Sequence, residues 1–191
     1  MSERLERDYF EKLYAESTDP WEFATSEYES RKYAQTLGAL ESRRFRRALE
    51  VGASIGVFTE MLAPYCDELV AVDTSSRAVN LARNRLAGSE HVLVEQRTLP
   101  EEMPEGPFDL IVAAEVLYYL PRQILLQTLR AFEIELAPGG MVLAVHWRRE
   151  TATYPLQGDE VHEVLYQHLS LANVKTLVEP EYRLDLFEDA S

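Results

Sequence analysis

The stretch Ala48-Leu-Glu-Val-Gly-Ala-Ser-Ile-Gly-Val-Phe-Thr59 decides how this chain folds. It opens with a short apolar run, passes through glycines at Gly52 and Gly56, and then becomes helical in pattern. Glycines at the turn between a strand and a helix let the backbone approach a ligand closely. The stretch therefore predicts a strand, a ligand-binding loop and a helix, which together open an α/β sheet.

The acidic residue before this loop indicates which cofactor it binds. A dinucleotide-binding loop prefers three glycines and a pyrophosphate at the helix N-terminus, but Ser54 stands at the middle position here. Glu50 suits a cationic amino group better than a phosphate, and S-adenosyl-L-methionine has an ammonium where a dinucleotide has its pyrophosphate. The loop therefore favours S-adenosyl-L-methionine, with S-adenosyl-L-homocysteine as the product, and disfavours a dehydrogenase.

Asp73 is the second cofactor residue that the pattern singles out. It ends the next apolar run, 21 residues after Gly52. A carboxylate at this place can accept hydrogen bonds from both ribose hydroxyls. The alternative is a helix cap, a role that Ser75 or Ser76 would fill equally well. The spacing behind the glycine loop favours ribose binding.

Short apolar runs alternate with amphipathic segments along the chain, which predicts a parallel sheet. Strands are expected at residues 48–51, 69–72, 91–95, 108–113, 141–146, 174–178 and 182–187. Helices are expected at 5–14, 28–40, 57–63, 76–86, 121–136 and 159–171, with a turn at 137–140. The connection Glu179-Pro-Glu181 is too short for a parallel crossover. We therefore expect an antiparallel hairpin at the end of the sheet.

The segment before the first strand, residues 1–41, is expected to form a helical lid over a core of residues 42–191, within one domain. Trp21 and Arg31 are its candidate cofactor residues, since a guanidinium can pair with the cofactor carboxylate and an aromatic ring can stack on adenine or a sugar. The alternative is a plain amphipathic helix, with Tyr33 and Leu37 on the core and Glu29 and Lys32 facing water.

The composition fits one globular domain of 191 residues, of which 46% are hydrophobic. The single cysteine, Cys66, allows no internal disulfide, and no apolar run approaches the ~20 residues that cross a bilayer. We expect a cytoplasmic protein without a membrane partner, a monomer or weak dimer. The net charge of −14 disfavours nucleic acid. The basic run Arg43-Arg44-Phe45-Arg46-Arg47 is expected to be a solvated strand edge.

Together with Phe108-Asp-Leu-Ile-Val-Ala-Ala-Glu115 and Leu136-Ala-Pro-Gly-Gly140, these motifs resemble the Rossmann-like methyltransferases over roughly residues 45–190. The resemblance implies an α/β fold with a seven-stranded sheet, mostly parallel with an antiparallel terminal strand, and helices on both faces. It places adenine beside the loop after the third strand and the sulfonium beside the end of the fourth. The expected cofactor residues are Trp21, Arg31, Glu50, Gly52, Ala53, Ser54, Gly56, Asp73, Thr74, Arg97, Thr98, Leu99, Ala114 and Glu115.

Four local segments carry a narrower resemblance. They are Asp19-Pro-Trp-Glu-Phe23, Tyr28-Glu-Ser-Arg-Lys-Tyr33, Glu115-Val-Leu-Tyr-Tyr-Leu120, and Val145-His-Trp-Arg148 with the later Gly158-Asp-Glu-Val-His162. Together they look like the nodulation protein S family, which N-methylates the deacetylated glucosamine end of chitooligosaccharides. The resemblance implies an N-methyltransferase whose acceptor is the amino group of such a sugar.

Methyl transfer to an amine needs only a modest base, whereas a hydroxyl acceptor needs a stronger base or a metal. No H-E-x-x-H, C-x-x-C or acidic metal loop occurs in the sequence, so no metal is expected. The candidate catalytic residues are Glu115, His146 and His162, and the candidate substrate-binding residues are Tyr28, Tyr118, Tyr119, His146, Arg148 and Asp159. As alternatives, His146 packs at a strand end and His162 forms a surface pair with Asp159.

Two other functions remain open from the sequence. One is a methyltransferase for an unrelated small-molecule amine, carboxylate or hydroxyl. The other is a non-catalytic regulatory protein that keeps the cofactor site. The intact Glu50, Gly52, Gly56 and Asp73 argue against decay of that site but do not establish turnover.

Overall fold

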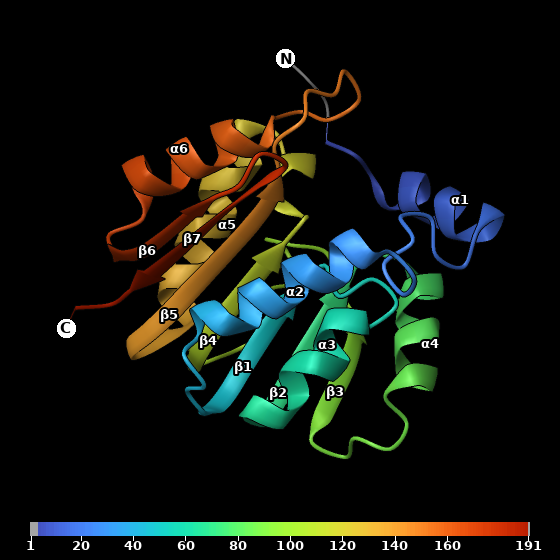
Figure 1. Ribbon diagram of the computed structural model, residues 1–191, viewed down its shortest axis with the longest axis horizontal. Coiled ribbons are helices and arrows are strands. Elements are labelled where there is room, and N and C mark those ends of the chain that lie inside the picture. The colour runs from blue at the N-terminus through green and yellow to red at the C-terminus, as the bar shows by residue number, and fades with distance from the viewer. Residues whose placement is uncertain (1–3, 191) are drawn as a thin grey trace. The chain divides into compact units, whose positions relative to one another are not determined.

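The computed structural model describes residues 4–190, which fall into two compact units. The N-terminal unit is Glu6–Thr98, and the C-terminal unit is residues 99–190 together with Arg4 and Leu5. Each unit contains its own group of paired strands and its own helices (Figure 1). Within residues 4–190, no helix is both long enough and apolar enough to span a bilayer.

The N-terminal unit holds three parallel strands in the order β3-β2-β1. Its elements are α1 (Arg7–Glu16), α2 (Glu27–Ala39), β1 (Phe45–Val51), α3 (Val57–Leu62), the 3₁₀ turn η1 (Ala63–Tyr65), β2 (Cys66–Asp73), α4 (Ser76–Arg85) and β3 (Val92–Gln96). Strands β1 and β2 are buried along most of their length, as expected where both faces of a parallel sheet are covered. Their carboxyl ends stand side by side, because Val51 pairs with Val72.

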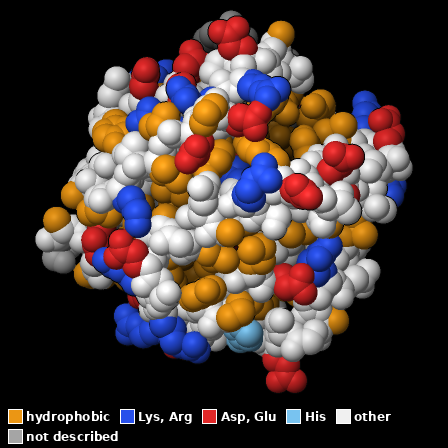
Figure 2. Space-filling model, in the orientation of Figure 1, with side chains coloured by type: hydrophobic (Ala, Val, Ile, Leu, Met, Phe, Trp, Pro, Cys, Tyr) orange, Lys and Arg blue, Asp and Glu red, His pale blue; other side chains and the backbone are white. Residues whose placement is uncertain are grey.

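The basic run at the start of β1 is a solvated edge, as predicted. Figure 2 shows Lys and Arg side chains gathered where Figure 1 draws the beginning of β1. Arg44 and Arg47 pair with Asp67 and Glu68 at the start of β2, with nitrogen–oxygen distances of 2.6 and 2.9 Å. These pairs join the start of β1 to the start of β2 at the protein surface.

The C-terminal unit holds four strands in the order β4-β5-β7-β6. Its elements are β4 (Phe108–Ala114), the 3₁₀ turn η2 (Leu117–Tyr119), α5 (Arg122–Glu135), β5 (Leu136–Trp147), α6 (Gly158–His168), β6 (Ala172–Val178) and β7 (Tyr182–Glu188). Strand β5 runs parallel to β4 and antiparallel to β7, and β6 pairs antiparallel with β7. The predicted terminal hairpin is confirmed. Helices α5 and α6 contact each other and β5 (Figure 1).

Two local predictions are corrected. The expected turn at residues 137–140 lies inside β5, which begins at Leu136 and is irregular there because the register moves from Leu136 to Met141 against β4. Glu29 and Lys32 of α2 do not face water: they are 8% and 2% exposed, with Lys32 Nζ 2.8 Å from Glu29 Oε2. Tyr33 is buried as predicted, its ring 5.2 Å from that of Phe58.

Candidate functional site

The predicted cofactor loop is held against the carboxyl end of β2. The N–H groups of Gly52 and Ala53 both donate to the carbonyl of Val72, at 2.8 and 3.0 Å. Gly52 and Gly56 have φ values of +77° and +79°, in the left-handed region that favours glycine. A Cβ on Gly56 would lie 3.1 Å from the Cβ of Ala82 in α4, so glycine also permits the close packing of loop and helix.

Ser54 and Asp73 are joined at the centre of this loop. The Ser54 N–H donates to Asp73 Oδ2, and the Ser75 N–H donates to Asp73 Oδ1, both at 2.9 Å. The cap of α4 is Ser75, whose side chain accepts from the Ala78 N–H, so Asp73 is not needed for that role. Burial, with a smaller contribution from the charge of Glu11, raises the pKa of Asp73 to about 6 even though backbone donors oppose the shift.

Glu50 presents a buried acceptor atom at the end of β1. The side chain is 3% exposed, and its Oε2 accepts no hydrogen bond within residues 4–190. Burial, reinforced by the charge of Asp73 and partly offset by Thr59, raises its pKa to about 8. An unsatisfied buried carboxylate oxygen is costly, and a ligand ammonium would satisfy it. The carboxylate acceptors of this unit, Glu50 and Asp73, therefore fit the amino group and the ribose hydroxyls of S-adenosyl-L-methionine.

Of the candidate adenine residues in the N-terminal unit, Thr74 and Thr98 contact each other, whereas the Arg97 side chain has a different partner. Thr74 and Thr98 lie together, with their hydroxyl oxygens 2.8 Å apart, and Thr98 also accepts from the Arg7 guanidinium at 2.9 Å. The side chain of Arg97 instead pairs with Glu95 at 3.2 Å. Leu99, which is buried, begins the other unit.

Helix α1 and the segment after it cover the loop. The Tyr14 hydroxyl lies 2.5 Å from Ser54 Oγ, and Trp21 packs with Tyr14 and the loop residue Ile55. Trp21 therefore lies at the loop, and its contact with the cofactor stays a prediction. Arg31 is not among these residues: its side chain is 71% exposed and lies 3.9 Å from Glu27.

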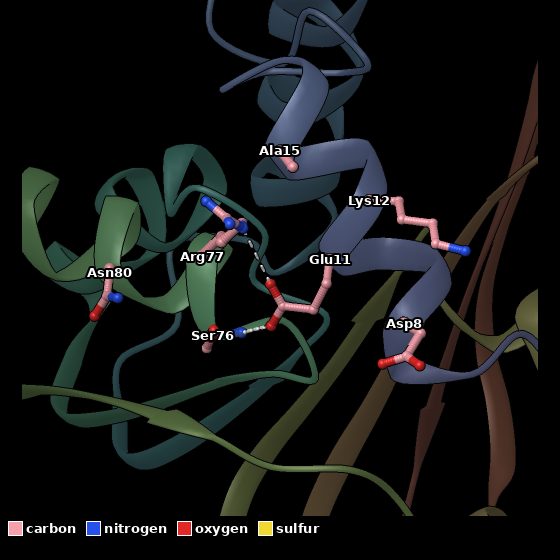
Figure 3. Close-up of a pocket in the computed structure, with 7 residues that line it drawn as sticks. All are labelled: Asp8, Glu11, Lys12, Ala15, Ser76, Arg77 and Asn80. Carbon is pink, nitrogen blue, oxygen red and sulfur yellow. Dashed lines mark hydrogen bonds and ion pairs between the residues drawn. The ribbon is translucent and has the colours of Figure 1, made fainter.

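Glu11 fastens α1 to the beginning of α4. Its carboxylate accepts from the Ser76 N–H at 2.6 Å and lies 3.6 Å from Arg77 Nε (Figure 3). Figure 3 shows these contacts beside an open hollow between the two helices. The hollow is lined by Asp8, Glu11, Lys12, Ala15, Ser76, Arg77 and Asn80, none of which is a predicted site residue.

Glu115 follows Ala114, the last residue of β4, and is held by three backbone or side-chain donors and acceptors. Its N–H donates to the Val145 carbonyl at 2.8 Å, and its Oε2 accepts from the Tyr118 hydroxyl at 2.7 Å and the Trp147 N–H at 2.9 Å. Its φ of +55° is uncommon for a residue with a side chain. Such strain persists where surrounding contacts hold it and is frequent at functional sites.

Tyr118 and Tyr119 pack with Tyr154, which sequence reasoning missed. The Tyr118 and Tyr154 rings stack at 4.9 Å with an interplanar angle of 12°, and Tyr119 meets both edge-on. Burial raises the pKa of Tyr118 and Tyr119 well above the ordinary value, so both hydroxyls stay protonated. Both tyrosines were predicted to bind the substrate, and both side chains are less than a tenth exposed, so direct contact of either with an acceptor stays a prediction. Tyr154 lies in an aperiodic loop, which gave no signal.

His146 and His162 are fully buried and in contact with each other. His146 Nδ1 lies 3.2 Å from His162 Nε2, and His162 Nδ1 lies 2.6 Å from Asp185 Oδ2. The alternative of a surface pair between His162 and Asp159 is wrong, because Asp159 binds Arg148 at 2.9 Å. A catalytic role for either histidine stays a prediction, and their burial favours an indirect one.

The remaining substrate candidates have partners inside the protein. Arg148 holds Asp159 with two nitrogens and donates to the Glu179 carbonyl at 2.9 Å, which ties the start of α6 to the hairpin. Tyr28 lies in the N-terminal unit, where Lys32 Nζ stands 5.1 Å from its ring centre. Among residues 4–190, no three His, Cys, Asp or Glu side chains are grouped as metal ligands.

Comparison with known proteins identifies the family. The model of the nodulation protein S (NodS) family matches residues 3–148. Nodulation protein S of Bradyrhizobium diazoefficiens is 44% identical over 105 residues, which are 53% of this chain and 49% of that protein. Nodulation protein S of Sinorhizobium fredii is 40% identical over 103 residues, 53% of this chain and 48% of that protein. The chain thus spans about half the length of the curated relatives it matches.

The fold is also found in a solved relative. The crystal structure of the N-methyltransferase NodS from Bradyrhizobium japonicum WM9, in complex with S-adenosyl-L-homocysteine, matches with a TM-score of 0.85. The match covers 97% of this chain and 98% of that one, at 26% identity. The predicted seven-stranded methyltransferase fold, mostly parallel with an antiparallel end, is therefore confirmed. By the extent of the family match, this chain belongs to the nodulation protein S (NodS) family.

Proposed function

We propose that this chain is an S-adenosyl-L-methionine-dependent N-methyltransferase whose acceptor is the amino group of a deacetylated glucosamine or chitooligosaccharide-like sugar. The observation that carries the cofactor is the buried Glu50 Oε2, which accepts no hydrogen bond within residues 4–190. The membership of the NodS family and the likeness to an N-methyltransferase crystallised with S-adenosyl-L-homocysteine support the reaction.

The N-terminal unit binds the cofactor in this proposal. Glu50 pairs with its ammonium, and Asp73, already oriented by the N–H groups of Ser54 and Ser75, accepts from the ribose hydroxyls. Thr74 and Thr98 line the adenine, and Trp21 covers the loop. When bound, S-adenosyl-L-methionine supplies a methyl group on a positively charged sulfur. A closed, dry loop raises the strength of the charged contacts and excludes water as a competing acceptor.

The C-terminal unit supplies the group that handles the acceptor. An amino sugar is an ammonium near neutral pH and must shed a proton before its nitrogen can act as a nucleophile. Glu115 is the carboxylate held for this task, because the Tyr118 hydroxyl and the Trp147 N–H fix its Oε2. A negative carboxylate both attracts the ammonium and accepts its proton. Tyr154, which is half-buried and stacks on the buried Tyr118, offers aromatic surface of the kind that packs against sugar rings.

The deciding experiment is transfer of a labelled methyl group to a panel of acceptors. The panel holds deacetylated chitooligosaccharides, the same sugars fully N-acetylated, free amines and hydroxylated compounds. We expect label only on the deacetylated sugars, because the acetylated ones lack the nucleophilic nitrogen but keep every hydroxyl. Glu115→Gln, assayed beside the parent protein, should lose most of the transfer.

Two results would overturn parts of the proposal. Label on free amines or hydroxyls but on no amino sugar would leave a methyltransferase with an unrelated acceptor. Tight binding of S-adenosyl-L-homocysteine with no transfer to any compound would favour a non-catalytic cofactor-binding protein.

A further inference from the structure

A chain of hydrogen bonds crosses the interior of the C-terminal unit from β7 to the turn after β4. Asp185, His162 and His146 each have fully buried side chains. His162 Nδ1 lies 2.6 Å from Asp185 Oδ2, and His146 Nδ1 lies 3.2 Å from His162 Nε2. At the far end, the backbone N–H of Leu117 donates to His146 Nε2 at 3.2 Å. The chain thus ends at the first residue of η2.

The two ends of this hydrogen-bonded series, the Leu117 N–H and the Asp185 carboxylate, determine which ring nitrogens carry protons. A backbone N–H can only donate, so His146 Nε2 must be the acceptor and its proton must sit on Nδ1. That Nδ1–H then donates to His162 Nε2, which leaves His162 with its own proton on Nδ1. The His162 Nδ1–H in turn donates to the carboxylate of Asp185. Both imidazoles are therefore neutral and share one tautomer.

This arrangement leaves neither ring free to take up a proton. A proton on His146 Nε2 would face the Leu117 N–H, and one on His162 Nε2 would face the His146 Nδ1–H. Burial lowers the pKa of His162, which agrees with a neutral ring. Although burial alone would raise the pKa of Asp185, hydrogen bonds from His162 and Thr176 hold it below the ordinary value.

This series of hydrogen bonds ends beside the residues that hold the Glu115 carboxylate. Leu117 is followed directly by Tyr118, whose hydroxyl donates to Glu115 Oε2 at 2.7 Å. The Tyr118 ring also stands 5.3 Å from the His146 ring, edge-on. A shift of the Leu117 amide would therefore move the hydroxyl that orients Glu115.

We propose that His146 and His162 are positioning residues, which hold η2 through the Leu117 N–H so that Tyr118 keeps Glu115 in place. Asp185 anchors the chain from β7, where Arg183 Nε and Thr176 Oγ1 also donate to it, at 2.8 and 2.5 Å. The inference rests on the proposed function, in which Glu115 handles the acceptor. In this proposal His146 and His162 position other groups and do not themselves transfer a proton, unlike the catalytic role that the sequence suggested.

The tautomers can be measured on the parent protein without any acceptor. Ring-nitrogen NMR shifts of isotope-labelled histidine should show His146 and His162 protonated on Nδ1 and unprotonated on Nε2 near neutral pH. His168, which is exposed on the last turn of α6, serves as the internal reference. An Nε2–H tautomer or a charged ring at either buried position overturns the proposal.

Paired substitutions then separate positioning from simple packing. His146→Gln keeps an acceptor within reach of the Leu117 N–H, whereas His146→Phe fills the space without one. We expect His146→Phe to lower kcat by about 10- to 100-fold, as misplaced groups do, with unchanged affinity for S-adenosyl-L-homocysteine. His146→Gln should restore most of the rate. Amide exchange at Leu117 should follow the same order, and this readout needs no turnover.

His162→Gln and His162→Phe repeat the test if a His146 variant does not fold, because Gln again keeps an acceptor for the His146 Nδ1–H. Equal loss in the Gln and Phe variants, or loss of cofactor affinity in step with kcat, means a structural role and overturns the proposal. Absence of transfer by the parent protein would instead count against the amino-sugar acceptor. The tautomer and amide-exchange results would still decide the positioning chain.

Discussion

The backbone N–H of Ser54 donates to the carboxylate of Asp73 at 2.9 Å, which joins the glycine loop after β1 to the carboxyl end of β2. This bond links the two sequence motifs that first indicated the cofactor. It also holds Ser54 at a φ of +51°, a conformation that side-chain-bearing residues rarely adopt without support. The loop and the ribose carboxylate therefore form one structural unit.

Asp73→Ala should weaken binding of S-adenosyl-L-homocysteine by at least about tenfold, or ~1.4 kcal/mol. The variant removes the ribose acceptor and the partner of the Ser54 N–H together. Isothermal calorimetry measures the change, and Asp67→Ala, at the opposite and exposed end of β2, is the matched control. Unchanged affinity in Asp73→Ala would remove this residue from the cofactor site.

Cofactor binding should release a proton near neutral pH. Burial raises the pKa of Glu50 to about 8, so its carboxyl is mostly neutral before binding, whereas pairing with an ammonium favours the ionised form. Affinity should therefore rise as the pH increases toward about 8 and level off above it. Calorimetry in buffers with different ionisation enthalpies reports the released proton directly.

Glu50→Gln provides the control for that measurement. The amide cannot ionise, so the proton release should disappear and affinity should fall, with little remaining dependence on pH in this range. Proton release of the same size in Glu50→Gln would assign the effect to another group, of which Asp73, with a pKa raised to about 6, is the first candidate.

Much of the fold followed from the sequence because its signals are local. Alternating apolar runs predicted the strands, and the three-residue connection before Tyr182 predicted the terminal hairpin that β6 and β7 form. The glycines and Asp73 could be found because they lie at a fixed spacing along one continuous segment, from β1 through α3 to the end of β2. These are properties that neighbouring residues determine together.

The missed features depend on tertiary packing, in most cases against partners far along the chain. Asp185 reads as an ordinary polar residue of an alternating strand, yet β7 is covered on both faces and His162 of α6 reaches it. Lys32 reads as solvent-facing, but Glu29 pairs with it and both are buried. Tyr154 stacks on Tyr118 from a loop without periodicity. Such contacts form only when the chain has folded, so no local sequence pattern predicts them.

Glu115→Gln should reduce turnover much more than cofactor binding. The amide keeps the length of the side chain and an oxygen that can accept from the Tyr118 hydroxyl and the Trp147 N–H, but it loses the charge and the basicity. Loss of a general base costs roughly 100- to 10,000-fold in kcat. Steady-state kinetics and calorimetry on the same preparation separate the two effects.

Glu150→Gln, an exposed position in the loop after β5, is the control for this variant and should leave both quantities unchanged. If Glu115→Gln lowers cofactor affinity as much as it lowers kcat, Glu115 contacts the cofactor and does not act on the acceptor.

Tyr14→Phe should loosen α1 from the cofactor loop. The Tyr14 hydroxyl and Ser54 Oγ are 2.5 Å apart and buried, so removing one leaves the other without this partner. That loss costs about 1–3 kcal/mol, which should lower the midpoint of urea unfolding. Tyr65→Phe makes the same chemical change at a half-buried position and should shift the midpoint far less. Because Ser54 also donates to Asp73, we expect the affinity for S-adenosyl-L-homocysteine to fall in Tyr14→Phe as well. A lowered midpoint with unchanged affinity would show that α1 stabilises the N-terminal unit without shaping the cofactor site.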